Sequence, residues 1–507
     1  MLDRFTQIGA LCQVVRRVVT RRLMFLVIPL LVATALLYLQ KNPGTNAFAL
    51  IALSSCAALW AWCGSARGLP LLPVMVVQGL LIYGIPIVAS NESLSYYTES
   101  SITAAGVEVM IFNLVLVAAW SAGMRIFTPS RPVSHALELV RSEGFKALTR
   151  IGFGLASAST VFVALDALGK TEPLYQVLPA GISSIFASLA SVAGASGFFL
   201  VSTAISGSAC TAFTKICFWV LLIVNACASA SSFLLSSAAI SLITVAIGLF
   251  WGSGRLPWRY LTLVILLLSF FNLGKATMRG RYWGAESEPS RVVQLSEVPD
   301  LYWEWVQTSY DAMLQNHNAP PAGIGTGSSK KNQTLLERID NMQNLLFVMD
   351  AVEREHIEPL HGATYTLIPP LLIPRVLWPD KPRSHEGQVL LNVHFGRQDI
   401  SSTFETYIAW GLLPEAFGNF GPIMGSVFLG VFFGFAFAWV ENLTARKLLV
   451  STEGFLALTL MISLMNSFEM VASVFITSTF QAFIVVVASS APFVRKVVTT
   501  GSSDAAP

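Results

Sequence analysis

Among the basic side chains in the one long polar interval of an otherwise apolar chain, six stand out as candidates for a site. They are Arg279, Arg281, Arg375, Lys381, Arg383 and Arg397. A guanidinium group matches two oxygens of a phosphate at once, so arginines suit a phosphate or pyrophosphate ligand. The cluster therefore predicts a site for an anionic lipid headgroup. Cations near helix ends also serve as plain membrane anchors, and this alternative stays open for each of them.

The stretch His361–Pro382, HGATYTLIPPLLIPRVLWPDKP, is the centre of this interval. It places Arg375 and Lys381 among prolines and aromatic residues, close to where the apolar sequence resumes. Proline fixes φ and removes a backbone donor, so Ile368–Pro374, IPPLLIP, is too interrupted for a regular helix. The stretch therefore predicts stiff, irregular backbone that holds cations at a membrane surface.

Two groups in or near this stretch could accept a proton. His361 begins it, and Glu415 precedes a later apolar run in LLPEAFGNFG. A neutral imidazole or a carboxylate can deprotonate a sugar hydroxyl. The sequence does not rank the two, since an exposed loop histidine and a carboxylate paired with a cation are the simpler roles. His356 and His361 are five residues apart with no cysteine nearby, which does not fit a structural zinc site.

The composition is that of a membrane protein. Hydrophobic residues make up 54% of the chain and charged residues only 12%, whereas soluble domains carry about 25% charged residues. Apolar runs that approach the ~20 residues needed to span a bilayer recur about twelve times, which predicts an all-α polytopic fold. The predicted spans are Leu23–Leu39, Ala47–Cys63, Leu69–Ala89, Ala104–Met124, Arg150–Leu168, Ala180–Thr203, Ala212–Ala228, Ser232–Trp251, Trp258–Leu273, Pro422–Val440, Phe455–Met465 and Val471–Ser489.

The basic residues between these runs fall on one side of the membrane if the spans alternate. Arg16, Arg67, Arg125, Arg255 and Arg446 belong to this set, whereas the opposite loops are short or acidic. The positive-inside rule then places both termini in the cytoplasm and the polar interval outside. We expect three parts: a bundle of about nine spans over residues 1–274, a large outer loop over 275–403, and about three further spans with a cytoplasmic tail over 404–507.

The distribution of apolar and aromatic residues in the outer loop predicts short amphipathic helices. Val298–Leu314 is rich in tryptophan and tyrosine, which predicts a helix in the lipid headgroup zone. Leu335–Val352 has apolar residues at a helical period. Between them, Asn316–Lys331 is rich in proline, glycine and serine, which predicts a linker or mobile loop.

Other site classes are not indicated. The six cysteines all lie outside the polar interval, so a disulfide framework or a thiolate metal cluster is not expected. The chain has no P-loop and no GxGxxG run that opens a helix, which argues against cytoplasmic nucleotide binding. No serine nucleophile elbow is present either.

Two blocks of residues resemble one family. Ile373–Pro382, IPRVLWPDKP, matches a proline–arginine–x–x–tryptophan–proline–x–lysine–proline pattern. Pro414–Gly430, PEAFGNFGPIMGSVFLG, matches an acidic residue, an aromatic residue and asparagine–aromatic–glycine before a glycine-rich span. Together they resemble the bacterial Wzy-type oligosaccharide repeat-unit polymerases, the O-antigen and exopolysaccharide polymerases. Phe417 departs from the tyrosine that is more frequent at its position in that family.

The resemblance implies a GT-C-like glycosyltransferase that joins repeat units carried on undecaprenyl pyrophosphate, by an inverting transfer with no metal and no cofactor. The donor and the acceptor are lipid-linked glycans at the outer face of the bacterial cytoplasmic membrane. Membrane lipids surround them, no nucleic acid takes part, and a polysaccharide chain-length regulator is an open further partner. The implied catalytic residues are Arg279, Arg281 and Arg375 for the pyrophosphate and Glu415 or His361 as the base. The implied substrate-binding residues are Lys381, Trp378, Arg383, Tyr282 and Asn419.

Two alternatives remain at this point. An O-antigen ligase of the same superfamily transfers finished polymer instead of extending it, and the sequence separates the two poorly. A lipid-linked oligosaccharide flippase or transporter fits the number of spans. Transporters, however, usually show repeat symmetry and binding residues near the membrane midplane, whereas the polar residues here concentrate in one outer loop.

Overall fold

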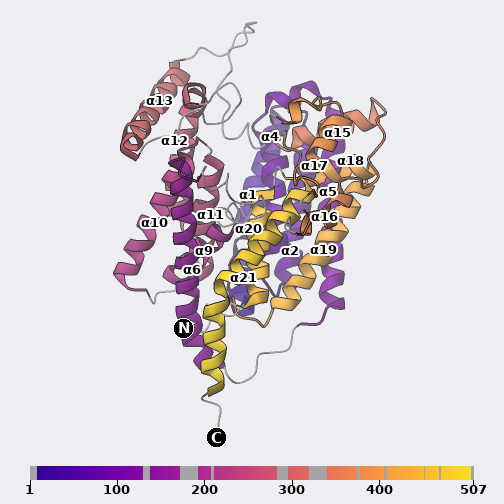
Figure 1. Ribbon diagram of the computed structural model, residues 1–507. Coiled ribbons are helices and arrows are strands. Elements are labelled where there is room, and N and C mark those ends of the chain that lie inside the picture. The colour runs from indigo at the N-terminus through magenta and orange to yellow at the C-terminus, as the bar shows by residue number, and fades with distance from the viewer. Residues whose placement is uncertain are drawn as a thin grey trace.

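The structure is a computed structural model in which all regular secondary structure of the described residues is helical (Figure 1). It describes residues 8–129, 137–171, 192–206, 210–233, 235–282, 295–318, 340–373, 377–378, 380–404, 408–449, 451–467 and 470–503. Arg375 and Pro374 of the predicted site therefore lie outside the described residues, as does most of the predicted loop Asn316–Lys331.

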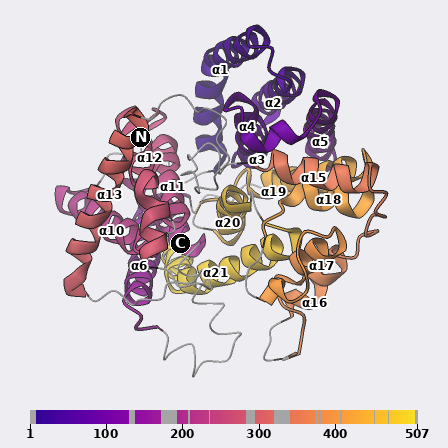
Figure 2. The ribbon, with the colours of Figure 1, turned by 90° about the horizontal axis from the view of Figure 1, so that it is seen from above.

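The helices form two bundles with further helices around them (Figures 1 and 2). The larger bundle contains α1 (Ile8–Leu39), α2 (Thr45–Ser65), α3 (Leu71–Gly79), η2 (Leu80–Gly84), α4 (Ile85–Val88), α5 (Glu99–Ile126), α19 (Met424–Thr444) and α20 (Thr452–Asn466). The second contains α6 (Leu137–Ala167), α9 (Gly194–Ser206), α10 (Ala212–Ala230) and α11 (Leu235–Ser253), with α21 (Ala472–Ser503) packed on both α6 and α20. The pair α12 (Trp258–Tyr282) and α13 (Val298–Asn318) lies at the side of the second bundle (Figure 2).

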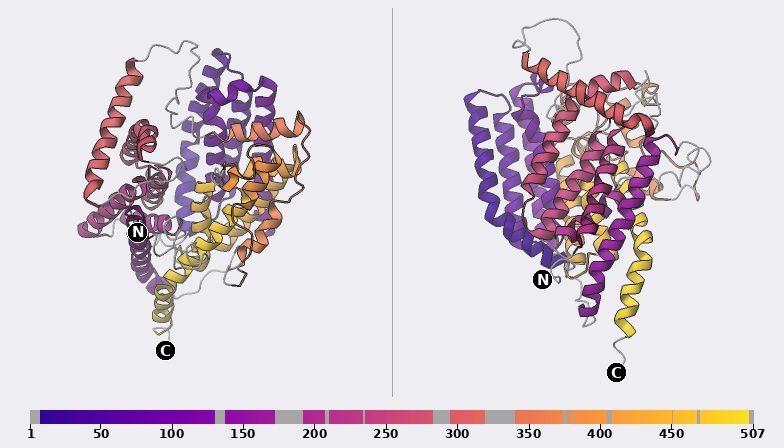
Figure 3. Two further views of the ribbon diagram at one scale, coloured as in Figure 1. Left: turned by 45° about the horizontal axis from the view of Figure 1, so that its top comes forward. Right: turned by 90° about the vertical axis from the view of Figure 1, so that its left-hand side faces the viewer.

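The part of the polar interval after residue 339 forms short elements over the larger bundle. These are α15 (Met342–Glu353), η6 (Tyr365–Leu367), α16 (Ile368–Leu372), α17 (Glu386–His394) and η7 (Ser402–Phe404), followed by α18 (Leu412–Phe420). Figure 3 shows the long helices running in the same general direction and α13 crossing them.

Seven helices of the described residues are long and apolar enough to cross a membrane, so the prediction of a polytopic helical membrane protein is confirmed at this level. They are Thr45–Ser65, Leu71–Val88, Glu99–Ile126, Thr149–Ala167, Ala212–Ala230, Trp258–Tyr282 and Met424–Thr444. Five shorter apolar helices accompany them: Val27–Leu39, Gly194–Ser206, Ser237–Ser253, Thr452–Met465 and Ala472–Ala488. The count of twelve spans stays a prediction.

Glycines let α5 and α19 approach closely. A Cβ atom built on Gly434 would lie 2.6 Å from both the carbonyl oxygen of Leu116 and the Cβ of Ala119. One built on Gly425 would lie 2.6 Å from the carbonyl oxygen of Ala416 in α18. Small residues allow this kind of backbone contact between membrane helices. The close contact at Gly425 fixes α18 against the start of α19.

Basic loops and polar elements gather at opposite ends of the larger bundle. At one end the Ile8 N–H donates to the Lys447 carbonyl at 3.1 Å, and Arg67 Nη1 donates to Asn442 Oδ1 at 2.8 Å. At the other end Asn91 Nδ2 and Ser93 Oγ donate to one carboxyl oxygen of Asp340, ahead of α15. The start of α15 therefore contacts the end of the bundle opposite to the one where Arg67 contacts Asn442.

Several local expectations need revision. Ile368–Leu372 does form one short helix, because its prolines occupy the first turn, where the missing N–H has no partner in any helix. The helix expected at Trp258–Leu273 continues to Tyr282, across the expected domain boundary at residue 274. Arg16, which precedes the expected span Leu23–Leu39, belongs to the same continuous helix, α1. Only the last part of the expected span Ala180–Thr203 lies within the described residues.

Candidate functional site

A buried carboxyl group joins three segments near the start of α19. Glu415 in α18 is wholly buried. Its Oε1 accepts a hydrogen bond from Thr364 Oγ1 at 2.7 Å, and its Oε2 accepts one from the Ala472 N–H at 2.5 Å. Asn419, one turn further along α18, donates from Nδ2 to Thr364 Oγ1 at 2.9 Å. The stretch His361–Pro382 is thereby attached both to α18 and to the beginning of α21.

The backbone around α18 fits this role. Two glycines in the left-handed region bracket the helix, Gly411 with φ 98° and Gly421 with φ 75°. A side chain would strain either position. Between them the helix is buried along almost its whole length. The Gly418 carbonyl also accepts from the Leu360 N–H at 2.9 Å, directly before His361.

Burial controls the charge of Glu415. It raises the pKa of this carboxyl to about 7, although the hydrogen bonds from Thr364 and the Ala472 N–H act in the opposite direction. A desolvated carboxyl group favours its neutral form. Both of its oxygens already accept bonds within the protein, and none of its surface is exposed. Glu415 is therefore arranged to position the loop at Thr364 rather than to meet a substrate directly.

His361 has the opposite surroundings. Its side chain is exposed, its φ is 50°, and Gly362 follows with φ 88°. Non-glycine residues seldom adopt this left-handed conformation, although histidine does so more readily than most. No hydrogen bond of the imidazole occurs among the described residues. The ring is therefore open to solvent three residues before Thr364, the residue that Glu415 holds.

Tyr365, the residue after Thr364, was not predicted as a site residue. Its ring stacks on Phe420 with centroids 5.7 Å apart and meets the edge of Phe428 at 5.2 Å. Its hydroxyl is buried and has no hydrogen-bond partner among the described residues. Burial, with the nearby Glu415, raises the pKa of this phenol well above its ordinary value. These three aromatic rings lie next to Thr364, so we include them in the candidate site.

The lysine of the predicted block, Lys381, binds the end of α16. Lys381 Nζ donates to the carbonyl oxygens of Leu371 at 2.7 Å and Ile373 at 2.6 Å, which lie at the end of α16. Trp378 is 41% exposed. A lysine that binds the last carbonyls of a helix stabilises that end. Lys381 thus has a structural role here, and Trp378 keeps a face available for a ligand.

Arg383 lies just beyond the block, at the start of α17. Its Nε is 3.3 Å from Glu386 Oε2 in an exposed ion pair. The Ser384 carbonyl next to it accepts from Ser473 Oγ at 3.2 Å, which attaches this segment to α21. The candidate substrate-binding residues Lys381, Trp378, Arg383 and Asn419 therefore belong to one connected region around the start of α21.

The other predicted cations lie elsewhere. At the end of α12, Arg279 Nη2 donates to the Phe233 carbonyl at 3.0 Å, and Arg281 forms a 2.6 Å ion pair with Glu304 of α13. Tyr282 also donates to Glu304 at 2.6 Å. The hydrogen bond from Tyr282 lowers the pKa of the Glu304 carboxyl, and the hydrogen bond from Arg281 lowers it by a smaller amount. Figures 1 and 2 place α12 and α13 on the opposite side of the molecule from α16, α17 and α18. The structure thus does not bring these three residues together with His361 and Glu415.

Arg397, another of the predicted cations, supports the packing of α15 against the segment before α18. Its guanidinium carbon lies 5.2 Å from the ring centre of Phe347 and 5.9 Å from that of Trp410. Its Nη2 donates to Asn344 Oδ1 at 2.8 Å. Burial lowers its pKa from the ordinary arginine value. The residue joins α15 to the segment that leads into α18.

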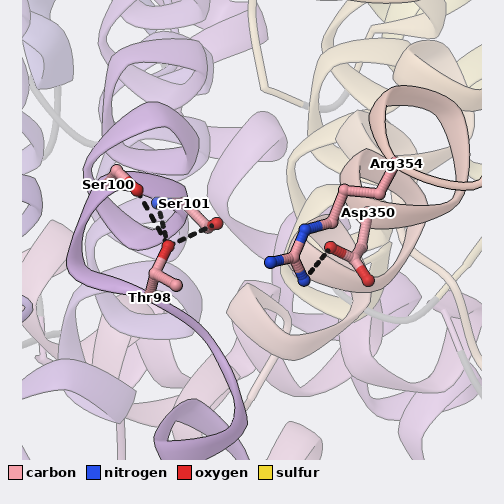
Figure 4. A network of polar contacts seen from close by, with 5 residues as sticks. All are labelled: Thr98, Ser100, Ser101, Asp350 and Arg354. Carbon is pink, nitrogen blue, oxygen red and sulfur yellow. Dashed lines mark hydrogen bonds and ion pairs between the residues drawn. The ribbon is translucent and has the colours of Figure 1, made fainter.

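Polar groups at the start of α5 and at the end of α15 bond with residues close to them in the sequence (Figure 4). Thr98 caps α5 by accepting from the Ser101 N–H at 3.2 Å. On the adjacent α15, Arg354 pairs with Asp350 one turn earlier at 3.0 Å. The described residues contain no group of three or more His, Cys, Asp or Glu side chains that could hold a metal ion.

The fold and site define a helical membrane protein with a carboxyl-centred loop site at one end of its larger bundle. Comparison of the chain with known proteins found no matching family model, no similar curated protein and no matching solved structure.

Proposed function

We propose that this chain is a bacterial cytoplasmic-membrane glycosyltransferase that polymerises oligosaccharide repeat units linked to undecaprenyl pyrophosphate. The observation that supports this proposal most is the contact between Thr364 and Glu415. It joins the stretch His361–Pro382, which ends in the first block that resembles Wzy-type polymerases, to the second block, Pro414–Gly430. The proposed arrangement has twelve spans in a GT-C-like fold, both termini in the cytoplasm and the site facing outward.

In the proposed reaction, a hydroxyl oxygen of the acceptor sugar attacks the anomeric carbon of the donor glycan. The bond from that carbon to pyrophosphate breaks, so the configuration inverts. His361 accepts the hydroxyl proton, because its ring is exposed whereas Glu415 is buried and fully bonded. Arg375 is the proposed partner of the leaving pyrophosphate, where a fixed cation stabilises developing charge.

The roles of Arg279 and Arg281 change within this proposal. The Arg279 guanidinium binds the Phe233 carbonyl, and the Arg281 guanidinium binds Glu304 of α13. These contacts favour anchoring of α13 over a direct part in the transfer. Lys381 stabilises the end of α16, and Trp378 and Arg383 are the proposed contacts around the sugar. Asn419 is wholly buried, and its proposed role is to support the loop through Thr364. Tyr282 joins Arg281 in the anchor, since both bind Glu304.

Purified protein in detergent tests the reaction, with lipid-linked repeat units as the only substrate. The wild type is expected to yield a ladder of longer lipid-linked glycans, and Arg375→Ala is expected to leave single units. Arg354→Ala is the control, since Arg354 is exposed and pairs only within α15. Transfer to a separate lipid acceptor without chain extension would indicate the ligase instead. A wild type that extends nothing in detergent yet moves the substrate across vesicle membranes would indicate the transporter.

His361→Ala is expected to reduce the rate of chain extension by about 10²–10⁴-fold, the usual effect of losing a general base. His356→Ala is a matched control, since His356 is also exposed and has a φ of 55°, five residues away. The initial rate of ladder formation measures both variants, with thermal unfolding to confirm equal stability. Equal rates for His361→Ala and the wild type would remove this residue from the mechanism.

A further inference from the structure

A small cavity lies beneath α18, among α3, η2, α5, α19 and the end of α20. Its volume is about 30 Å³, and the polar residues that line it are Gln78, Tyr83, Asn341 and Ser467. A water molecule needs roughly 10–15 Å³ measured in this way. The cavity therefore has room for about two water molecules and is far too small for a sugar.

Gln78 requires a polar partner in this place. Neither its Nε2 nor its Oε1 has a hydrogen-bond partner among the described residues, and both atoms are buried. The residue lies near the middle of the apolar span Leu71–Val88. An amide buried without hydrogen bonds loses roughly 1–3 kcal/mol for each unsatisfied group, and lipid supplies no partner. Gln78 also lines the cavity.

The cavity is built into the fold by a local change in helix type. Leu80–Gly84 is a π-helical segment, which widens the turn directly after Gln78. The Ile82 carbonyl of that turn accepts from the Asn341 N–H at 3.1 Å, so the start of α15 attaches there. Single π-helical turns occur often at functional sites. Tyr83 also forms a hydrogen bond with Asn341, on the same side of the cavity.

We propose that this cavity binds a pair of water molecules that connect Gln78 with Asn341. Gln78 offers two N–H donors and one carbonyl acceptor, and Ser467 and Tyr83 contribute hydroxyl oxygens within reach of the same space. The water pair couples the centre of a membrane span to the outer helix α15. This inference does not depend on the proposed transferase activity. No carboxylate lines the cavity, so neutral water fits it better than a metal cation.

X-ray radiolytic labelling of the full-length protein in nanodiscs tests the proposal, because radicals form at bound water. Met75 lines the cavity, while Met278 is fully buried between α12 and α13 and serves as the dry reference. We expect Met75 to be labelled on the order of tenfold faster than Met278 if two waters occupy the site. In Gln78→Leu, which keeps the volume and removes the polar atoms, the rate at Met75 is expected to fall to that of Met278.

Two results would overturn the proposal. One is a wild type in which Met75 and Met278 are labelled equally slowly, which would mean that the cavity is dry. The other is fast labelling of Met75 that persists in both Gln78→Leu and Gln78→Met, which would mean that Gln78 does not hold the water. Thermal unfolding of each variant shows that the apolar replacements leave the fold intact.

Discussion

Replacing Glu441 with alanine is expected to destabilise the larger bundle more than any other single substitution near its basic end. The Glu441 carboxyl in α19 is wholly buried. Its Oε1 accepts from the indole N–H groups of Trp62 at 3.2 Å and Trp120 at 3.1 Å, and its Oε2 accepts from the Arg67 N–H at 3.3 Å. The alanine variant leaves all three donors without a partner, at roughly 1–3 kcal/mol each.

The measurement is thermal unfolding in detergent, followed by the exposure of buried free thiols such as Cys12 and Cys63. Glu441→Gln is the matched control, because it keeps the volume and one carbonyl acceptor for the indoles. We expect the order wild type, then glutamine, then alanine, with the alanine variant poorly folded. A midpoint for alanine within about 2 °C of the wild type would show that the three bonds contribute little.

The position of Glu441 shows what sequence patterns leave out. The apolar run Pro422–Val440 predicts the helix, and it ends where Glu441 begins. Nothing local in the sequence indicates that Trp62 and Trp120, more than 300 residues earlier, both point at this carboxyl. Periodicity reports burial, whereas partners across helices depend on the packing of the whole bundle. Glu441 was therefore not among the residues that the sequence pointed to.

The candidate site, too, could be predicted from the sequence only in part. Residue types identified the stretch His361–Pro382 and Glu415 as places where chemistry could occur, and the structure joins them through Thr364. Thr364 and Tyr365 were missed, although both lie in the highlighted stretch, because a threonine and a tyrosine have no distinctive spacing. Arg281 was grouped with this site by charge alone. Only the fold shows that Glu304 in α13 binds it, away from α18.

Glu415→Gln is expected to remove a pH dependence of stability that the wild type shows between about pH 4.5 and pH 7. The folded protein holds the Glu415 proton more tightly, since the pKa rises from 4.5 to about 7 on burial. Stability therefore falls as pH rises through this window, because the folded state binds more protons than the unfolded state. A shift of this size corresponds to about 3 kcal/mol. Glutamine is neutral throughout this pH range, so the variant lacks this pH-dependent contribution to stability.

Unfolding midpoints of both proteins between pH 4.5 and pH 8.5 measure the difference. The advantage of Glu415→Gln over the wild type is expected to grow with pH and to level off above about pH 7, as linkage requires. Glu304→Gln is the control, because the pKa of Glu304 is lowered and its difference from the wild type is expected to stay flat in this range. If the difference in midpoint between Glu415→Gln and the wild type also does not change with pH, burial does not raise the pKa of Glu415 and the prediction is wrong.

The same variant separates positioning from catalysis at Glu415. The glutamine side chain can still accept from Thr364 or from the Ala472 N–H, so the loop keeps much of its support. We therefore expect Glu415→Gln to extend chains within about tenfold of the wild-type rate, far less than the 10²–10⁴-fold loss typical of a missing base. Glu415→Ala, which supports neither donor, is expected to lose more. If Glu415→Gln instead matches the loss in His361→Ala and the loop stays ordered, Glu415 is the base and His361 is not.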